Sequence, residues 1–336
     1  MIHRAKGIIR TALHSSGAVD AVRRLRRRSL RILMYHHFSP DSARLLEQCE
    51  HIRNYYQPVS LELLGVSLQT SKPLPYNSLV ITVDDGYRDF YLYAYPVFRD
   101  CQIPVTVFLV SDFVDGKIWL WSDQLEYVFQ HTSKNVVSLQ WMNGPSKHMN
   151  LDTSERRLRV SNQVFYALIR VNNDERVQRM DELSKVLGVE LPASLPPKLS
   201  PLSWVEIREM ARNGVTFGAH TRTHPILSRL SDADTLRDEI EGCKLRIEEE
   251  LRQPALHFSY PNGKVADFNK HTVEAVRRAG FLTGVTSERG LNSDLADSFL
   301  LRRIGVEPLG DTPYFRELLA GIIDARGCKP RYDSLK

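Results

Sequence analysis

Leu79-Val-Ile-Thr-Val-Asp-Asp-Gly86 is the stretch of sequence that says most about the fold. Its first five residues are apolar or β-branched, which predicts a short strand buried on both faces, as in a parallel sheet. The run stops at two aspartates and a glycine, so a turn follows the strand. In a barrel of alternating strands and helices, the residues that follow a strand face the catalytic mouth. The two carboxylates are therefore candidate active-site residues.

Similar apolar runs recur along the chain, with helical segments between them. Further strands are predicted over residues 32–35, 105–110, 215–219, 255–260, 282–286 and 299–306. Ser203 and Glu206 form the pattern of a capping box, which predicts a helix beginning there and ending before Gly214. Ser231 is expected to cap one long helix that continues to Leu251. About seven such units, with no glycine-rich phosphate loop after any strand, predict an α/β fold of the irregular (β/α)7-barrel type.

The alternation of strands and helices breaks in the middle of the chain, where polar and helical stretches end in a proline-rich segment. We predict a largely helical insertion, or lid, at this place. Trp121 lies near its start, and both helix packing and sugar-ring stacking are open roles for this side chain. The predicted division is a basic N-terminal arm over 1–30, barrel parts over 31–111 and 203–325, the insertion over 112–202, and a C-terminal tail over 326–336.

Basic residues are concentrated at the N-terminus. Residues 1–31 hold nine Lys and Arg against one acid, a net charge of +8, so the rest of the chain sums to −3. A nearly neutral body argues against a broad nucleic-acid-binding face. The arm is either solvated and disordered or a patch that meets anionic lipid head groups. No apolar signal-peptide core follows the basic residues. We therefore expect a cytoplasmic protein, with peripheral contact at the inner face of the membrane as a further hypothesis.

The residues suited to metal binding follow different predicted strands. Asp84 and Asp85 follow one strand, and His220 and His224 follow another. Two histidines four residues apart lie on one face of a helical turn and can bind one metal. With Asp85 they make a two-histidine, one-carboxylate site, which suits hydrolysis because such a metal activates water and polarises a carbonyl. Zinc is the first expectation for these donors, and Co, Mn, Ni and Fe stay open. Taken singly, each pair could also be a cap, a turn or chance.

Three segments, in chain order, resemble the motifs of the polysaccharide deacetylases of carbohydrate esterase family 4, the NodB-homology domain. They are Thr82-Val-Asp-Asp-Gly86, His220-Thr-Arg-Thr-His224 and Phe258-Ser-Tyr-Pro-Asn-Gly263. The resemblance covers about residues 31–115 and 203–310. It implies an irregular barrel that removes N-acetyl groups from amino sugars.

The resemblance also implies a role for individual residues. It makes Asp84 the general base and Asp85, His220 and His224 the metal ligands. The main-chain N–H of Tyr260 becomes a hydrogen-bond donor to the developing oxyanion, beside the metal. These roles agree with the chemistry of amide hydrolysis, which needs a base for the water and donors for the negative charge.

Several features of the family are missing from this sequence, and two of them bear directly on the reaction. Ser259 stands near the place of an arginine that pairs with the base in many members, and the tail Leu300–Val306 has no histidine to act as general acid. The chain therefore resembles a divergent branch that carries Met34-Tyr-His36 on the first strand. We assign His36 as the replacement acid or a substrate-positioning residue, with a structural histidine as the alternative. Arg303 is the candidate to orient the base.

These observations predict a metal-dependent hydrolase that removes N-acetyl groups from an amino-sugar glycan or a glycan precursor. The expected partner is an N-acetylated glycan or a lipid-linked sugar, and no nucleic acid. Two alternatives stay open. One is a hydrolase of another non-peptide C–N bond, such as a cyclic amide or imide, that uses the same metal set. The other is a catalytically silent glycan-binding protein, which the missing tail histidine favours.

Overall fold

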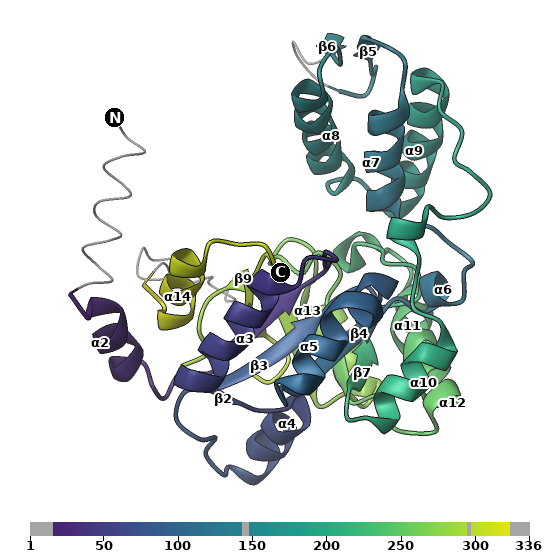
Figure 1. Ribbon diagram of the computed structural model, residues 1–336. Coiled ribbons are helices and arrows are strands. Elements are labelled where there is room, and N and C mark those ends of the chain that lie inside the picture. Colours follow the sequence, from purple (N-terminus) through teal and green to yellow (C-terminus); the bar gives the residue numbers. More distant parts are fainter. Residues whose placement is uncertain (1–15, 143–147, 294–296, 323–336) are drawn as a thin grey trace.

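The structure is a computed structural model that describes residues 16–142, 148–293 and 297–322 (Figure 1). Seven parallel strands follow one another as β1-β10-β9-β8-β7-β4-β3, and β1 pairs with β3 to close the ring. The predicted (β/α)7-type barrel is therefore confirmed. The strands of the ring are β1 Arg31–Tyr35, β3 Ser78–Val83, β4 Val105–Leu109, β7 Thr216–Ala219, β8 His257–Ser259, β9 Thr283–Arg289 and β10 Leu301–Gly305.

Strands β3 and β4 are buried along their whole length because both of their faces are covered. All six residues of β3 and all five of β4 are buried, as expected for strands between a filled barrel interior and outer helices. A short strand, β2 (Gln57–Pro58), pairs with the start of β3. The helices around the barrel are α3 Ala43–Tyr55, α4 Leu61–Thr70, α5 Tyr95–Asp100, α10 Trp204–Arg212, α13 Lys270–Arg278 and α14 Thr312–Ala320. A π-helical turn, Phe90–Ala94, precedes α5.

The helix ends agree with the sequence in one place and differ in another. Ser203 and Glu206 form the predicted capping box at the start of α10. The long helix expected from Ser231 begins instead with Asp232 as N-cap, whose carboxylate accepts a hydrogen bond from Thr235 N at 2.7 Å. This helix is also interrupted. It runs as α11 Ala233–Arg237, a π-helical segment Asp238–Gly242, and α12 Cys243–Leu251.

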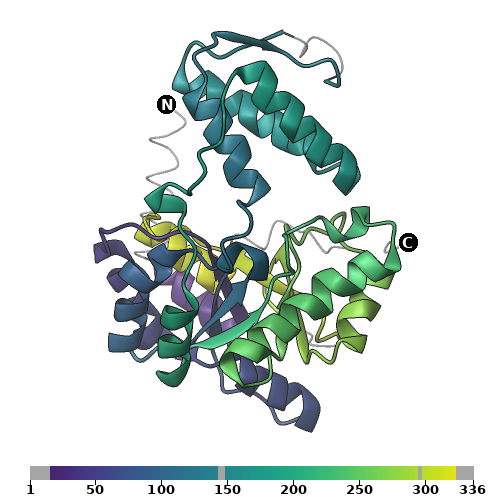
Figure 2. The same ribbon diagram turned by 90° about the vertical axis from the view of Figure 1, so that its right-hand side faces the viewer.

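The middle of the chain forms a separate body that stands over one end of the barrel (Figures 1 and 2). Its elements, all inside the predicted insertion over 112–202, are α7 Trp121–His131, α8 Ser154–Leu168, α9 Asn173–Leu187 and the antiparallel hairpin β5 Val136–Ser138 with β6 His148–Asn150. They enclose an apolar core of their own. Trp121 belongs to this core, where its ring stacks on Phe165 with centroids 5.0 Å apart. Of the two roles left open for Trp121, packing is the one observed.

Short elements connect these parts. Helix α6, Ser111–Val114, follows β4, and 3₁₀ turns lie at Pro197–Leu199 and Leu227–Arg229. A helix long and apolar enough to cross a membrane does not occur among the described residues.

Part of the basic arm forms a helix, which differs from the disordered arm that the sequence allowed. Helix α2, Ala18–Leu25, contacts α14. Arg31 belongs to β1 and is fully buried; its guanidinium donates to the main-chain oxygens of Leu319 and Ser29 at 2.6 Å each. Its charge is therefore not part of a surface patch. Residues 1–15 of the arm and the tail over 326–336 lie outside the described residues.

Candidate active site

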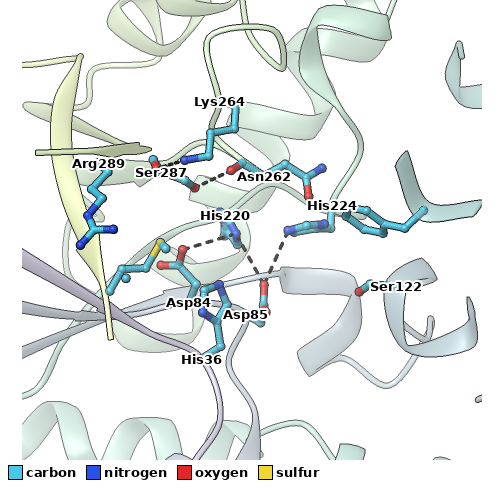
Figure 3. Close-up of a pocket in the computed structure, with 13 residues that line it drawn as sticks. His36, Asp84, Asp85, Ser122, His220, His224, Asn262, Lys264, Ser287 and Arg289 are labelled. Carbon is cyan, nitrogen blue, oxygen red and sulfur yellow. Dashed lines mark hydrogen bonds and ion pairs between the residues drawn. The ribbon is translucent and has the colours of Figure 1, made fainter. Parts of the chain in front are cut away.

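A pocket of about 460 Å³ lies at the mouth of the barrel, where the carboxyl ends of the strands meet (Figure 3). This is the end at which barrels of this kind carry their catalytic residues. Most of the lining comes from the loops after β1, β3, β7 and β8 and from residues of β1, β9 and β10, while Ser122 and Phe165 come from the insertion. The lining residues are Met34, His36, Asp84, Asp85, Ser122, Phe165, His220, His224, Asn262, Lys264, Ser287, Arg289 and Gly305.

A left-handed turn after β3 sends the two adjacent carboxylates to different partners. Asp85 has φ +75° and Gly86 has φ +90°. Gly86 is required here, because a Cβ at this position would come within 2.9 Å of Leu109 Cδ2. The Asp84 carboxylate faces Arg303. Asp85 points towards the imidazoles after β7, as Figure 3 shows.

Asp85, His220 and His224 come together as the sequence predicted. Asp85 Oδ1 lies 3.5 Å from His220 Nε2 and 3.6 Å from His224 Nε2. One donor atom from each of the three residues lies within 4.8 Å of the others. Asp85 Oδ1 is buried and has no hydrogen-bond partner in the described parts of the chain. Three converging donors around an oxygen that lacks a partner fit a divalent cation.

The segment His220–His224 brings its two imidazoles together through a loop, and not through the helical turn that the spacing suggested. Thr221 and His224 both have left-handed backbones, with φ +69° and +58°. Thr221 Oγ1 accepts a hydrogen bond from His224 N at 3.1 Å and so closes the loop. His220 Nδ1 lies 2.7 Å from the main-chain oxygen of Ser259, which leaves Nε2 for the pocket. The imidazole centroids are 4.8 Å apart.

Asp85, His220 and His224 carry no positive charge of their own. Burial raises the pKa of Asp85 to about 8, and repulsion from Asp84 acts in the same direction. Burial lowers the pKa of His220 to about 4 and that of His224 well below its usual value. The imidazoles are therefore neutral, which is the form that binds metal. A cation between these three side chains would favour the ionised form of Asp85.

Arg303 pairs with Asp84, as the sequence suggested it could. Its Nη1 and Nη2 donate to Asp84 Oδ1 and Oδ2 at 2.7 Å each. Arg303 Nη2 also donates to Ser259 Oγ at 2.9 Å, and its Nε donates to Thr286 O at 2.9 Å. Burial would raise the pKa of Asp84, but the Arg303 guanidinium outweighs burial and lowers it below its usual range. Asp84 is thus an ionised carboxylate, held in one orientation.

His36 lines the pocket beside Asp84 and Asp85 (Figure 3). Its side chain is exposed at the mouth of the pocket, where loss of hydration lowers the pKa of the imidazole, although the charge of Asp84 acts in the opposite direction. Its neighbour His37 is outside the lining, with Nδ1 2.9 Å from Asp89 Oδ2 and the ring 3.9 Å from that of Tyr87. The structure therefore places His36, and not His37, where a substrate could be reached, and the role of His36 stays a prediction.

The prediction that the Tyr260 N–H faces the oxyanion is wrong. This N–H donates to Val285 O at 3.1 Å, as part of the pairing between β8 and β9. The Tyr260 ring is buried and stacks on Phe268. Asn262, two residues further on, lines the pocket in its place, in a left-handed turn with φ +56°. The pairing of β8 with β9 extends one N–H beyond Ser259, the last residue of β8, and therefore uses the Tyr260 N–H.

Several pocket residues had no sequence signal that we recognised. Phe165 comes from α8, 79 residues after Gly86 and 55 before His220, and no periodicity marks it out from the other apolar residues of the helix. Lys264 and Arg289 place two basic side chains on one side of the pocket. Asn262 could have been found, because it lies inside the Pro–Gly loop that the sequence had singled out.

Taken together, a closed parallel barrel, a buried Asp/His/His donor set and a neighbouring ionised aspartate define a hydrolase barrel of the deacetylase type. The family model described as polysaccharide deacetylase matches residues 71–284. The chain belongs to the polysaccharide deacetylase family.

Relatives of known name agree with this family. YxkH of Bacillus subtilis, whose name assigns it provisionally to the polysaccharide deacetylases, is 21% identical over 286 residues, 83% of this chain and 72% of that protein. The poly-β-1,6-N-acetyl-D-glucosamine N-deacetylase of Escherichia coli K12 is 37% identical over 78 residues, which are 23% of this chain and 12% of that protein.

Two solved structures share the fold. The deacetylase PplD of Streptococcus pyogenes, in complex with acetate, matches with a TM-score of 0.55 and 18% identity over 85% of this chain and 96% of that one. IcaB of Ammonifex degensii matches with a TM-score of 0.56 and 18% identity over 87% of this chain and 97% of that one.

Proposed function

We propose that this chain is a metal-dependent hydrolase that removes N-acetyl groups from an amino-sugar glycan or glycan precursor. One observation carries the proposal: the buried donor set Asp85, His220 and His224 lies beside Asp84, whose carboxylate Arg303 holds ionised. One carboxylate that can bind the metal and a second, ionised carboxylate beside it that can accept a proton from water suit metal-assisted hydrolysis. Membership of the polysaccharide deacetylase family supports the acetamide as the bond cleaved.

Asp85, His220 and His224 are the residues that would hold the divalent cation. Bound there, the cation would supply Lewis-acid chemistry, which polarises the acetyl carbonyl and lowers the pKa of water. Zinc is the first candidate for two imidazoles and a carboxylate, followed by Co, Mn, Ni and Fe.

The protein's own residues divide the remaining steps. Asp84 accepts a proton from the attacking water. Arg303 keeps the Asp84 carboxylate ionised and holds it in one orientation. The water oxygen bonds to the acetyl carbon, the C–N bond breaks, and acetate leaves. His36 is our candidate to deliver a proton to the departing amine nitrogen, because it lines the same pocket beside Asp84. The main-chain N–H of Asn262 is the candidate donor to the developing oxyanion.

The pocket favours an amino sugar as the group bound. Its volume of about 460 Å³ accommodates a sugar ring with its acetamide, and Phe165 gives the insertion side an aromatic surface. The E. coli relative is named for a poly-β-1,6-linked N-acetylglucosamine polymer, which makes oligomers of this sugar the first substrate to test. A lipid-linked N-acetylated sugar is the second.

The test is release of acetate from N-acetylglucosamine oligomers, before and after treatment with a chelator. We expect release by the metal-loaded protein, loss with the chelator, and recovery when zinc is returned. Release that a chelator leaves unchanged would contradict the metal requirement. Hydrolysis of a cyclic amide or imide, with no acetate from any glycan, would favour the first alternative. Glycan binding without any release would favour the silent binding protein.

We further propose that the basic N-terminal region contacts an anionic membrane, which would put the protein at the inner face of the membrane. The support is the exposed end of α2, where Leu25 is 84% exposed and Arg24, Arg27 and Arg28 are exposed around it. Basic side chains around an apolar one suit a surface of anionic head groups. Co-sedimentation with vesicles of phosphatidylglycerol tests this, and equal binding to neutral phosphatidylcholine vesicles would contradict it.

A further inference from the structure

Glu239 is a buried carboxylate that binds the middle of the loop between His220 and His224. It lies in the π-helical segment Asp238–Gly242 and is 8% exposed. Its Oε2 accepts hydrogen bonds from the main-chain N–H groups of Arg222 and Thr223 at 2.9 Å each. Its Oε1 accepts from Thr223 Oγ1 at 2.5 Å. One side chain from the π-helical segment thus fixes two of the peptide N–H groups inside the histidine motif.

The loop needs such support because its backbone is strained. Thr221 and His224 are non-glycine residues in the left-handed region, which costs about 1–3 kcal/mol each unless the surroundings impose it. Neighbouring main chain contributes as well: Ser111 N donates to Thr221 O at 3.2 Å, and Asp112 N donates to Arg222 O at 3.0 Å. These bonds hold the loop by its carbonyl groups, and Glu239 holds it by its N–H groups.

The π-helical turn explains how Glu239 reaches the loop. A π-turn adds one residue to a helical turn and is frequent at functional sites. Here it directs Glu239 and Ile240 into the interior, while Asp238 stays on the surface and pairs with the Arg222 side chain. The main-chain oxygen of Glu239 also accepts from Arg222 N, at 3.1 Å. Both the backbone and the side chain of this segment therefore bind the same peptide group.

We propose that Glu239 is a positioning residue that sets the spacing of the two imidazoles and thereby the metal affinity of the site. The inference rests on the proposed metal set and adds to it a residue that touches neither metal nor substrate. Residues that orient metal ligands commonly change affinity by 10- to 100-fold when they are replaced.

Zinc affinity of the full chain is the first measurement. Wild type and variants are stripped with a chelator and titrated with zinc against a chromophoric competitor. We expect Glu239→Ala to weaken zinc binding about 10- to 100-fold. Glu239→Gln should recover most of this loss, because its amide oxygen can accept both N–H groups and its NH₂ can donate to Thr223 Oγ1. Glu241→Gln, on the same segment, removes the same charge away from the loop and should bind zinc as wild type does.

Amide hydrogen exchange of the metal-free proteins is the second measurement, and it needs no metal. In Glu239→Ala, the amides of residues 222 and 223 should exchange at least about tenfold faster, and Gln should restore their protection. If alanine prevents folding, the comparison of Glu239→Gln with Glu239→Leu replaces it. If none of these variants alters zinc affinity or amide exchange, the proposed role of Glu239 is wrong, while the proposed metal set is unaffected. A wild-type protein that takes up no zinc would overturn the proposed metal set instead.

Discussion

Arg303 on β10 and Asp84 after β3 form a buried, bidentate ion pair, with both N–O distances at 2.7 Å. The two residues are 219 positions apart in the chain, and neither is more than 2% exposed. A planar guanidinium fixes the plane of a carboxylate as well as its charge. Ser259, at the place where many family members have an arginine, now accepts a hydrogen bond from Arg303. The pairing function is thus present in the site, but it comes from a different strand.

Replacing Arg303 by lysine tests this pair. Lysine keeps the charge but removes the two parallel donors, so Asp84 is no longer held in one plane. We expect kcat/KM for acetate release to fall about 10- to 100-fold while zinc content stays the same, since general-base help is worth 10²–10⁴ in full. Arg303→Met would leave a buried carboxylate unpaired and should lower stability by about 3–5 kcal/mol. Arg302→Lys is the control next to it, and wild-type kinetics for Arg303→Lys would refute the orientation role.

The two adjacent aspartates should respond differently to the same substitution. Asp84→Asn removes the base but none of the three donors, so zinc content should stay near wild type while kcat falls about 10²- to 10⁴-fold. Asp85→Asn removes the carboxylate donor, and the protein should retain far less zinc after dialysis. Metal analysis and acetate release on the same samples check both results. Equal loss of zinc in the two variants would show that the division of labour is wrong.

His36→Asn tests the residue whose role the structure leaves open. We expect zinc content to stay unchanged and turnover to fall at least about tenfold, because proton transfer to the amine loses its donor. His37→Asn is the matched control, since His37 contacts Asp89 and Tyr87 outside the pocket lining and should leave turnover near wild type. Unchanged turnover in His36→Asn would remove His36 from the mechanism.

Asp123 gives a dependence of stability on pH at the contact between insertion and barrel. Burial raises its pKa from 3.8 to about 6, and the Tyr87 O–H donates to its Oδ2 at 2.8 Å. A folded pKa above the unfolded one means that the carboxyl stabilises the fold fully below about pH 4 and loses this contribution as the pH rises through 6. Asp123→Asn keeps a neutral acceptor at every pH.

We therefore expect Asp123→Asn to raise stability relative to wild type at pH 7.5, by about 3 kcal/mol at most, and by only about 1 kcal/mol at pH 4.5. Thermal unfolding at the two pH values measures the change. Glu182→Gln, at an exposed position of α9, is the control and should show the same difference from wild type at both values. A gain for Asp123→Asn that is larger at pH 4.5 would reverse the assigned direction of the pKa shift.

Local sequence pattern determined the barrel and the Asp/His/His donor set. Apolar runs such as Leu79–Val83 define the strands, and in a parallel barrel the residues that follow the strands must meet at one mouth. Asp85, His220 and His224 could therefore be placed together without coordinates, because their convergence depends only on which strands they follow.

Tertiary structure alone decided how the side chains and peptide groups are used. The pairing of β8 with β9 assigns the Tyr260 N–H to Val285 O and leaves the pocket to Asn262. The bonds from Glu239 reach the histidine loop across a helix whose π-turn no local pattern indicated. Both depend on strand register and on contacts between distant segments. Residue spacing encodes which groups can meet, whereas packing selects the partner that each donor and acceptor finally takes.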